Sequence, residues 1–254
     1  MKNYPQIIPL NNIPMVEAGE DLARLIFESC QNEEVELLDN DVICIAQKIV
    51  SKAEDRQIPL EGVSPSQEAI NLAEETDKDP RLVELILKES SEILRKKPGV
   101  LIVRHKLGIV GANAGIDQSN IDHAGGEHAL LLPEAPDFSA QKIKSDLDLM
   151  CGRQLGVLIT DSHNRPWRMG TTGSAIGSAG IKVLDDRRGG HDLYGRELKV
   201  TLINRADAIA AIATLYMGET IEKIPVVIFR GNTMQSNDDN AQMINRPLEE
   251  DLFR

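Results

Sequence analysis

The sequence has few aromatic residues and an excess of negative charge. Its 254 residues include only four Phe, three Tyr and one Trp. Proteins that bind nucleic acid by stacking bases on aromatic rings need more such side chains, so the composition argues against that class. Lys and Arg total 28 against 40 Asp and Glu, which gives a formal net charge of −12. This balance also argues against binding to nucleic acid or to a membrane surface, because both are negatively charged.

Long hydrophobic runs and paired cysteines are also lacking. No segment approaches the roughly 18 apolar residues that a membrane span requires. The N-terminal sequence MKNYPQIIPLNNIP has no continuous apolar segment of the kind found in secretory signals. The three cysteines form no C-x-x-C pair and cannot all pair within one chain. These features predict a cytoplasmic protein whose cysteines are reduced and buried as small apolar side chains.

Helical and strand patterns follow one another along the chain and predict a mixed α/β (α+β) fold. Helical spacing of apolar residues marks 19–31, 80–97, 139–150 and 206–217. Apolar or β-branched runs predict strands at 42–50, 100–104, 108–112, 156–161, 197–203 and 224–231. The glycine-rich segment 170–180 is expected to form a loop. Because no linker or repeat interrupts the pattern, one unit with two interleaved subdomains is the expected organisation.

The short motifs that commonly identify nucleotide-binding or hydrolytic sites are missing. The chain has no G-x-x-x-x-G-K-[ST] loop and no G-x-S-x-G elbow, and its glycines at 170–180 do not follow G-x-G-x-x-G. The five histidines include no H-E-x-x-H pattern, so zinc is not expected. His123 and His128 lie in a glycine-containing loop, where solvent-exposed side chains are more common than metal ligands.

Carboxylates stand at the ends of several predicted elements. Asp117 follows a strand, Asp161 ends the strand GVLITD just before Ser162, and Glu219 comes directly after a helix. Oxygen ligands of this kind bind Mg²⁺ and Mn²⁺ together with water and phosphate, and the end of a strand is a frequent position for them. Each acid alone is more often a helix cap or a surface residue. The pattern therefore leaves a metal role and a structural role both open.

Basic residues close to these acids are compatible with phosphate binding. Arg165 and Arg168 follow Asp161 in NRPWRMG, and Lys48 and Lys52 lie around the end of the predicted strand 42–50. Arg and Lys beside metal-binding acids suit a polyphosphate ligand. The same lysines also fit an ordinary solvated surface, so spacing alone does not decide between a phosphate site and a surface.

Several segments together resemble one family, F420-0:gamma-glutamyl ligase, also called coenzyme F420-0:L-glutamate ligase. RPWR, NAGID and DLYGREL are the most specific of them. The matching blocks occur in family order and are QKIVSKAE (47–54), ANAGIDQSN (112–120), TDSHNRPWRMG with SAIGSAGI (160–181), DLYGREL (192–198), ADAIAAIATLYMGE (206–219), IPVVIFRG (224–231) and RPLEEDLFR (246–254).

The resemblance implies a GTP-dependent enzyme that adds L-glutamate to the deazaflavin precursor F420-0 through an acyl phosphate. It also implies two Mg²⁺ or Mn²⁺ ions per subunit, K⁺ as a further ion, and a homodimer of an α+β fold with two subdomains. The expected unit covers residues 1–254, without the nitroreductase-like extension of some members.

The resemblance further implies roles for individual residues. Asp117, Asp161, Ser162 and Glu219 correspond to metal ligands, and Arg165 and Arg168 are candidates for positioning the acyl phosphate. The nucleotide-binding positions are Asn12, Ile13, Pro14, Met15, Gln47, Lys48, Lys52, Asn120, Met217, Gly218, Thr220, Ile221, Glu222, Lys223 and Ile224.

The chain departs from the family pattern beside the expected metal site. Many members read D-T-F-G-R-P-W-R, whereas this chain reads DSHNRPWR, so that His163 and Asn164 replace an apolar residue and a glycine. Gly111 stands where a cysteine is common. These changes leave open a paralogous amide-forming ligase with another carboxylate acceptor. A metal-dependent phosphohydrolase is a second alternative, and a non-catalytic binding protein ranks last because all three acids are present.

Overall fold

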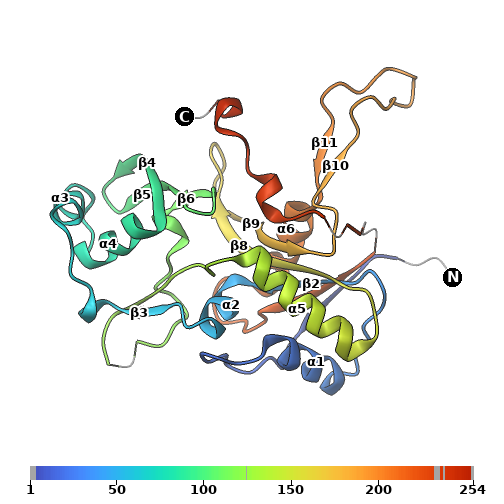
Figure 1. Cartoon of the computed structure of the whole chain (residues 1–254), viewed down its shortest axis with the longest axis horizontal. Coiled ribbons are helices and arrows are strands. Elements are labelled where there is room, and N and C mark those ends of the chain that lie inside the picture. Colours follow the sequence, from blue (N-terminus) through green and yellow to red (C-terminus); the bar gives the residue numbers. More distant parts are fainter. Residues whose placement is uncertain (1–3, 124, 232–234, 237, 253–254) are drawn as a thin grey trace.

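The computed structural model describes residues 4–123, 125–231, 235–236 and 238–252. At its centre is a five-stranded sheet with the strand order β1-β12-β2-β8-β9 (Figure 1). These strands are β1 (Gln6–Leu10), β2 (Val42–Ala46), β8 (Gly156–Asn164), β9 (Thr171–Ala179) and β12 (Val226–Arg230). β2 and β8 are parallel, and the other neighbouring strands are antiparallel. The carboxyl ends of β2 and β8 therefore lie at the same edge of the sheet.

Helices cover both faces of this sheet. Ile43 and Ile45 of β2 belong to the core that includes α1 (Leu22–Asn32) and α5 (Pro136–Cys151). The alternate β2 residues, Val42 and Cys44, belong to the core beneath α6 (Arg205–Met217). The unbroken apolar run of β2 is typical of a strand with both faces covered. The result is a helix–sheet–helix arrangement in three layers.

Side-chain caps explain where these helices begin. Asp21 accepts a hydrogen bond from the Arg24 amide at the start of α1, and Asn204 accepts one from the Asp207 amide at the start of α6. α5 ends at Gly152, whose φ of 67° suits glycine in a helix C-cap.

A second group of elements, residues 57–131, is inserted between α2 (Gln47–Ala53) and α5 and has its own apolar cluster (Figure 1). Leu72, Ile86 and Leu101 are among the buried residues of this cluster. Its elements are β3 (Gln57–Pro59), α3 (Gln67–Thr76), α4 (Pro80–Glu89), β4 (Ser90–Lys97), β5 (Val100–His105), β6 (Val110–Ala112) and β7 (His128–Leu130). The strands pair as β4-β5-β6 and as β3-β7. The predicted mixed α/β class is confirmed.

One hairpin projects from the body of the protein. It is formed by β10 (Leu184–Asp186) and β11 (Leu202–Asn204), and the connecting residues 187–201 extend away from the sheet (Figure 1). Short 3₁₀ turns occupy Leu60–Gly62, Asn113–Gly115, Ala241–Ile244 and Leu248–Glu250. In the described part of the chain, no helix has both the length and the apolar character needed to cross a membrane.

Two predicted elements change type partway along. The predicted strand 42–50 ends at Ala46, and the helix α2 follows at once. Ile49 and Val50 are buried in this helix, and short apolar runs do not distinguish a buried strand from a buried helix. The predicted helix 80–97 ends at Glu89, because residues Ser90–Lys97 pair with β5 as strand β4. Strand β5 lies outside residues 80–97, whose spacing alone was the basis of the helix prediction.

The glycine-rich segment 170–180, predicted as a loop, is mainly strand β9. A Cβ atom at Gly173 would lie 2.7 Å from the carbonyl carbon of Ala210 in α6, and one at Gly177 would lie 2.5 Å from that of Pro136 in α5. Both glycines therefore allow a helix to approach the backbone of the strand closely. The strand predicted at 197–203 is also shorter, because only Leu202–Asn204 pair with β10.

Candidate active site

A cavity of about 1180 Å³ lies at the edge where β2 and β8 end. Ala46, the last residue of β2, is aligned with Thr160 of β8 in the parallel register. Gln47 then begins α2, whereas β8 continues to Asn164 in its pairing with β9, so Asp161 does not end the strand as predicted. Gln47 and Asp161 both line the cavity where the parallel pairing of β2 with β8 stops. The crevice beyond the carboxyl ends of parallel strands is the usual position for ligands in open α/β sheets.

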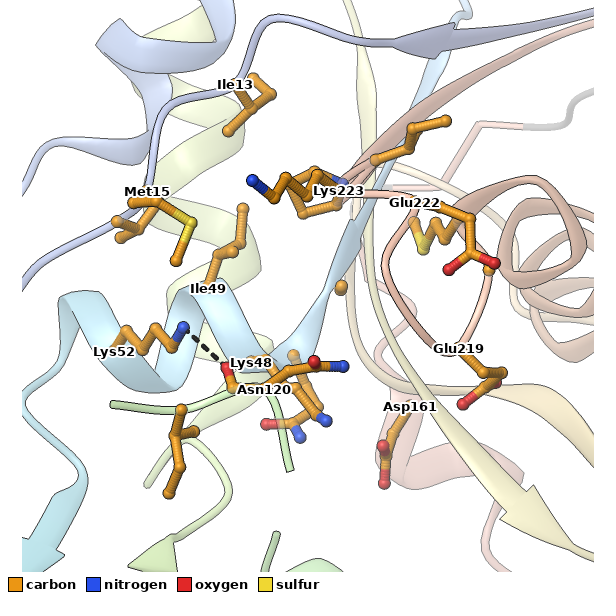
Figure 2. A pocket seen from close by; sticks show the side chains of 18 of the residues that line it. Ile13, Met15, Lys48, Ile49, Lys52, Asn120, Asp161, Glu219, Glu222 and Lys223 are labelled. Carbon is orange, nitrogen blue, oxygen red and sulfur yellow. Dashed lines mark hydrogen bonds between the residues drawn. The ribbon is translucent and has the colours of Figure 1, made fainter. Parts of the chain in front are cut away.

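The cavity wall is built from segments that are far apart in the sequence. Figure 2 shows Asp161 and Glu219 near one another, with Met15 and Lys52 on the opposite side of the view. The lining residues come mainly from 13–18, 46–49, 120–122, 160–162 and 217–225. This combination of two strand ends, a helix and three loops forms one continuous binding space.

Oxygen atoms collect at one end of the cavity. The Ser162 hydroxyl donates a hydrogen bond to Oε2 of Glu219 over 3.1 Å, which joins the end of β8 to the loop after α6. One residue before Asp161, the buried Thr160 hydroxyl lies 3.7 Å from the Met217 sulfur atom. These contacts hold the end of α6 against β8 and keep Asp161 and Glu219 on the same wall.

The loop after α6 has a compact structure that positions its side chains. The Glu222 carboxylate accepts hydrogen bonds from the Thr220 amide (2.8 Å) and the Thr220 hydroxyl (3.0 Å). Gly218 has φ 74°, and a Cβ there would lie 2.5 Å from Cγ of Glu222. The backbone conformation, with φ 74° and ψ 178°, favours glycine at this position.

Two lysines of α2 contact the loop of residues 117–122. The Lys48 ammonium lies 2.7 Å from Oδ2 of Asp117 and donates to Ser119, and the Lys52 ammonium donates to the Asn120 carbonyl over 3.1 Å (Figure 2). Burial, together with the positive charge of Lys48, lowers the pKa of Lys52 below its ordinary value. The lysines thus bring positive charge to the cavity and hold its wall in place.

The carboxylate of Asp117 is held by contacts with other side chains of the protein. Burial raises the pKa of its carboxyl group, but the contacts with Lys48 and Ser119 together lower the pKa by more than burial raises it. The net pKa therefore lies below the ordinary value. Asp117 is therefore a stable anion whose charge is partly balanced by Lys48. Asp117 contacts Lys48, which lines the cavity, but Asp117 itself is not part of the cavity lining.

Gln47, one of the residues that line the cavity, has a buried side-chain amide. Its side chain is 2% exposed, and its Oε1 accepts a hydrogen bond from the Ser51 hydroxyl over 2.9 Å. Within the described residues, the amide nitrogen Nε2 has no hydrogen-bond partner. A buried polar group in this state favours an acceptor from a ligand, because leaving it unpaired is costly.

Most of the predicted site residues come together around this space. All of the nucleotide-binding positions except Asn12 line the cavity, and so do Asp161, Ser162 and Glu219. Asn12 is not part of the cavity lining, and its backbone amide donates a hydrogen bond to Oε1 of Glu33. Arg165 and Arg168 are exposed in the turn between β8 and β9 and do not line the cavity of this chain.

The donor atoms fit a hard divalent cation only in part. Asp161, Ser162 and Glu219 supply oxygen ligands on one wall, which is the donor type that Mg²⁺ and Mn²⁺ prefer. Across the described residues, no three His, Cys, Asp or Glu side chains converge as a preformed metal cluster. Asp117 is paired with Lys48, so it would have to exchange that partner to bind a cation.

His163 lies directly behind the acidic end. Its Nε2 atom is 3.0 Å from Oδ2 of Asp161, and both side chains are largely buried. Burial lowers the pKa of His163, but the hydrogen bond and charge of Asp161 raise it more, so that the net pKa lies above the ordinary value. A Cβ atom at Gly111 would contact the same ring at 3.6 Å. Asn164, the other departure from the family pattern, lies at the end of β8 opposite Thr171.

The sequence analysis missed several residues of the cavity. Asp122 and His128 line it. The other polar lining residues that were missed are Glu17, Asp55, Gln57, Thr160 and Thr214. The pairing of β3 with β7 brings Gln57 and His128 to this wall, and such a contact between distant short strands leaves no signal in local spacing.

A mixed α/β protein with lysines, a buried amide donor and carboxylates around one large crevice is suited to a phosphate-bearing ligand. Comparison with known proteins gives the class. Residues 11–231 match the F420-0:Gamma-glutamyl ligase family. Proteins named Coenzyme F420:L-glutamate ligase are similar over nearly their whole length. The one from Methanothermobacter thermautotrophicus is 45% identical over 98% of each chain. That from Methanocaldococcus jannaschii is 42% identical over 100% of this chain and 98% of its own.

A third relative with the same name, from Methanopyrus kandleri, is 45% identical over 94% of this chain and 93% of its own. The family match covers most of the chain, and each relative is covered almost completely. The chain therefore belongs to the F420-0:gamma-glutamyl ligase family.

Proposed function

We propose that this protein is a GTP-dependent ligase that joins L-glutamate to F420-0 by an amide bond and can add further gamma-linked glutamates. One observation carries the proposal: in a chain that matches the ligase family, a single cavity is lined by every expected nucleotide position except Asn12. The cavity volume of about 1180 Å³ exceeds the roughly 300–1,000 Å³ of a typical single-ligand pocket. That size supports a site for two substrates at once.

The proposed reaction has two balanced steps. First, a carboxylate oxygen of F420-0 attacks the terminal phosphorus of GTP, which forms an acyl phosphate and releases GDP. Second, the amine of glutamate attacks the acyl carbon, the C–O bond to phosphate breaks, and inorganic phosphate and a proton leave. Activation converts a poor leaving oxygen into a good one, so the protein contributes mainly charge neutralisation and alignment.

The residues of the cavity suit this division of work. Lys48 and Lys52 bring positive charge to the side where the phosphates would bind, and Gln47 Nε2 offers a buried donor to an acceptor of the nucleotide. Arg165 and Arg168 remain proposed as positioning groups for the acyl phosphate. Their exposed turn would have to move toward the cavity, or act on a neighbouring subunit, to do so.

Asp161, Ser162 and Glu219 are the proposed ligands for Mg²⁺ or Mn²⁺, with Asp117 as a further ligand once it leaves Lys48. Two such ions, with K⁺ as an additional ion, would neutralise the charge on the phosphates. Oxygen ligands of this kind are the usual donors for cations that bind together with nucleotides.

The proposal includes a cytoplasmic homodimer in which residues 1–254 form one ligase unit of two subdomains. The projecting hairpin supports self-association, because its connecting residues carry Leu193, Tyr194 and Val200, which are 98%, 95% and 85% exposed. Exposed apolar side chains on a projecting arm favour a protein partner. Light scattering of the purified protein is expected to give the mass of two chains.

Omission experiments separate this ligase from a phosphohydrolase that uses the same acids. Continuous formation of GDP and phosphate is expected only when F420-0, L-glutamate, GTP and a divalent ion are all present, because without glutamate the reaction stops after the acyl phosphate has formed. Equal phosphate release without an acceptor would instead support the phosphohydrolase. A paralogous ligase with another acceptor is the second candidate, because His163 lies beside the site. Such a ligase would leave F420-0 unchanged and would join the amino acid to a different carboxylate.

A pH prediction follows from Lys52. Because its pKa is lowered, the ammonium loses its charge at a lower pH than an ordinary lysine, and GTP binding is expected to weaken as the pH rises through that pKa. Lys52→Arg is expected to flatten this alkaline rise in the KM for GTP, since guanidinium stays charged. Lys52→Met is expected to raise the KM by about tenfold at neutral pH, as loss of a charge-assisted hydrogen bond would, and the difference from the wild type is expected to shrink as the pH rises.

The measurement is the KM for GTP between neutral and alkaline pH for the three proteins. Parallel pH profiles of the wild type and Lys52→Arg would contradict a role for the charge of Lys52.

A further inference from the structure

Asp161 and His163 are two residues apart in β8, so their side chains leave the same face of the strand. The Nε2 atom of His163 lies 3.0 Å from Oδ2 of Asp161. Among the described residues, no other side chain pairs with this carboxylate. In the described part of the chain, His163 is therefore the side chain that holds the Asp161 carboxylate.

The chemistry of imidazole suits this contact. A histidine whose Nε2 carries a hydrogen can donate to a carboxylate in either its neutral or its charged form. Donation to Oδ2 occupies one oxygen of Asp161 and leaves Oδ1 available to the cavity that Asp161 lines. The side chains of His163 and Asp161 are only 15% and 13% exposed, so water competes little for the contact.

Gly111 of β6 provides room for the imidazole. A Cβ atom there would lie 3.6 Å from Cδ2 and 3.9 Å from Nε2 of His163, which is ordinary contact distance for one methyl group. A longer side chain would extend toward the ring edge that donates to Asp161. Two of the departures from the family pattern, Gly111 and His163, thus meet in space, although they come from different sheets.

From this geometry we propose that His163 is a positioning residue, which orients Asp161 for binding a divalent cation at the acidic end of the cavity. The inference rests on the proposed function, because it takes Asp161 as a metal ligand. An apolar ring of similar size could fill the same space, but it could not donate to Oδ2. Groups that orient a metal ligand typically change metal affinity by about 10–100-fold when they are removed.

The test is a titration of the purified full-length protein with Mn²⁺ alone, with free Mn²⁺ followed by electron paramagnetic resonance. His163→Phe removes the donor and keeps the ring, and we expect the Mn²⁺ affinity to fall by about tenfold. His163→Gln can still donate from its amide and is expected to recover most of the affinity. Gly111→Ala is the matched control: it adds one methyl group against the ring and is expected to bind Mn²⁺ like the wild type.

Thermal unfolding of each variant reports its folding, and if His163→Phe fails to fold, His163→Leu, which also removes the donor, takes its place in the test. Wild-type affinity in His163→Phe, or equal losses in a folded His163→Gln and a folded His163→Phe, would overturn the inference. The same titration of Asp161→Asn distinguishes a failure of the role of His163 from a failure of the metal assignment in the proposed function. If Asp161→Asn loses Mn²⁺ while His163→Phe does not, only the role of His163 fails. If Asp161→Asn binds Mn²⁺ normally, the metal assignment in the proposed function fails, and the inference with it.

Discussion

Asp161→Asn is expected to lower the rate of glutamate ligation by about a hundredfold to a thousandfold while the protein remains folded. The substitution removes one negative charge from the oxygen-rich wall that also carries Ser162 and Glu219. Loss of one preorganised group that stabilises charge in the transition state typically has an effect of this size. The size and shape of the side chain hardly change, so a packing defect is not expected.

Rates of GDP formation with F420-0, glutamate and Mn²⁺ measure this effect, and thermal unfolding reports whether the variant is folded. Asp146→Asn is the matched control, because Asp146 lies on α5 in an ion pair with Lys142 on the helix surface and far from the cavity lining. Such an exposed pair contributes little to stability. Full activity of Asp161→Asn would contradict the assignment of this carboxylate to the site.

Gly177→Ala is expected to have the largest effect on stability, a loss of about 3 kcal/mol in the free energy of unfolding. The new Cβ would lie 2.5 Å from the carbonyl carbon of Pro136, a backbone atom at the start of α5. A flexible side chain could move aside, but a backbone carbonyl can move only if α5 shifts away from β9. Both elements belong to the main core, so such a shift would loosen its packing.

Urea unfolding measures this loss as a lower midpoint at an unchanged slope. Gly62→Ala is the control, because a Cβ at Gly62 meets nothing within 4 Å. A Gly177→Ala protein within about 1 kcal/mol of the wild type would be far below the effect of overpacking and would contradict the close packing of α5 on β9.

The local sequence predicted those elements whose burial alone decides their structure. The helix predicted at 206–217 agrees with α6, and the apolar run before Asp161 agrees with β8. Asp161 and Glu219 could be recognised as site residues because Asp161 comes directly after the buried run of β8 and Glu219 follows α6, and both positions line the cavity. In these cases the apolar pattern that predicts the element and the burial that stabilises it involve the same few residues.

Pairing between distant segments limits what the sequence can show. β4 replaces the end of a predicted helix because β5 supplies its hydrogen bonds. Lys48 binds Ser119, 71 residues away, and that contact turns two separately predicted site segments into one wall. The glycines of β9 resemble a loop until the approach of α5 and α6 is known. Each of these features depends on which segments meet, and local spacing carries no record of that.

The central claim is that the cavity at the ends of β2 and β8 joins glutamate to F420-0 at the expense of GTP. Mass spectrometry of F420-0 incubated with the protein, GTP, L-glutamate and Mn²⁺ tests it most directly. The expected product is heavier than F420-0 by one glutamyl unit and is absent when GTP or the Asp161 carboxylate is removed. F420-0 that stays unchanged while the folded wild-type protein consumes GTP would contradict the account.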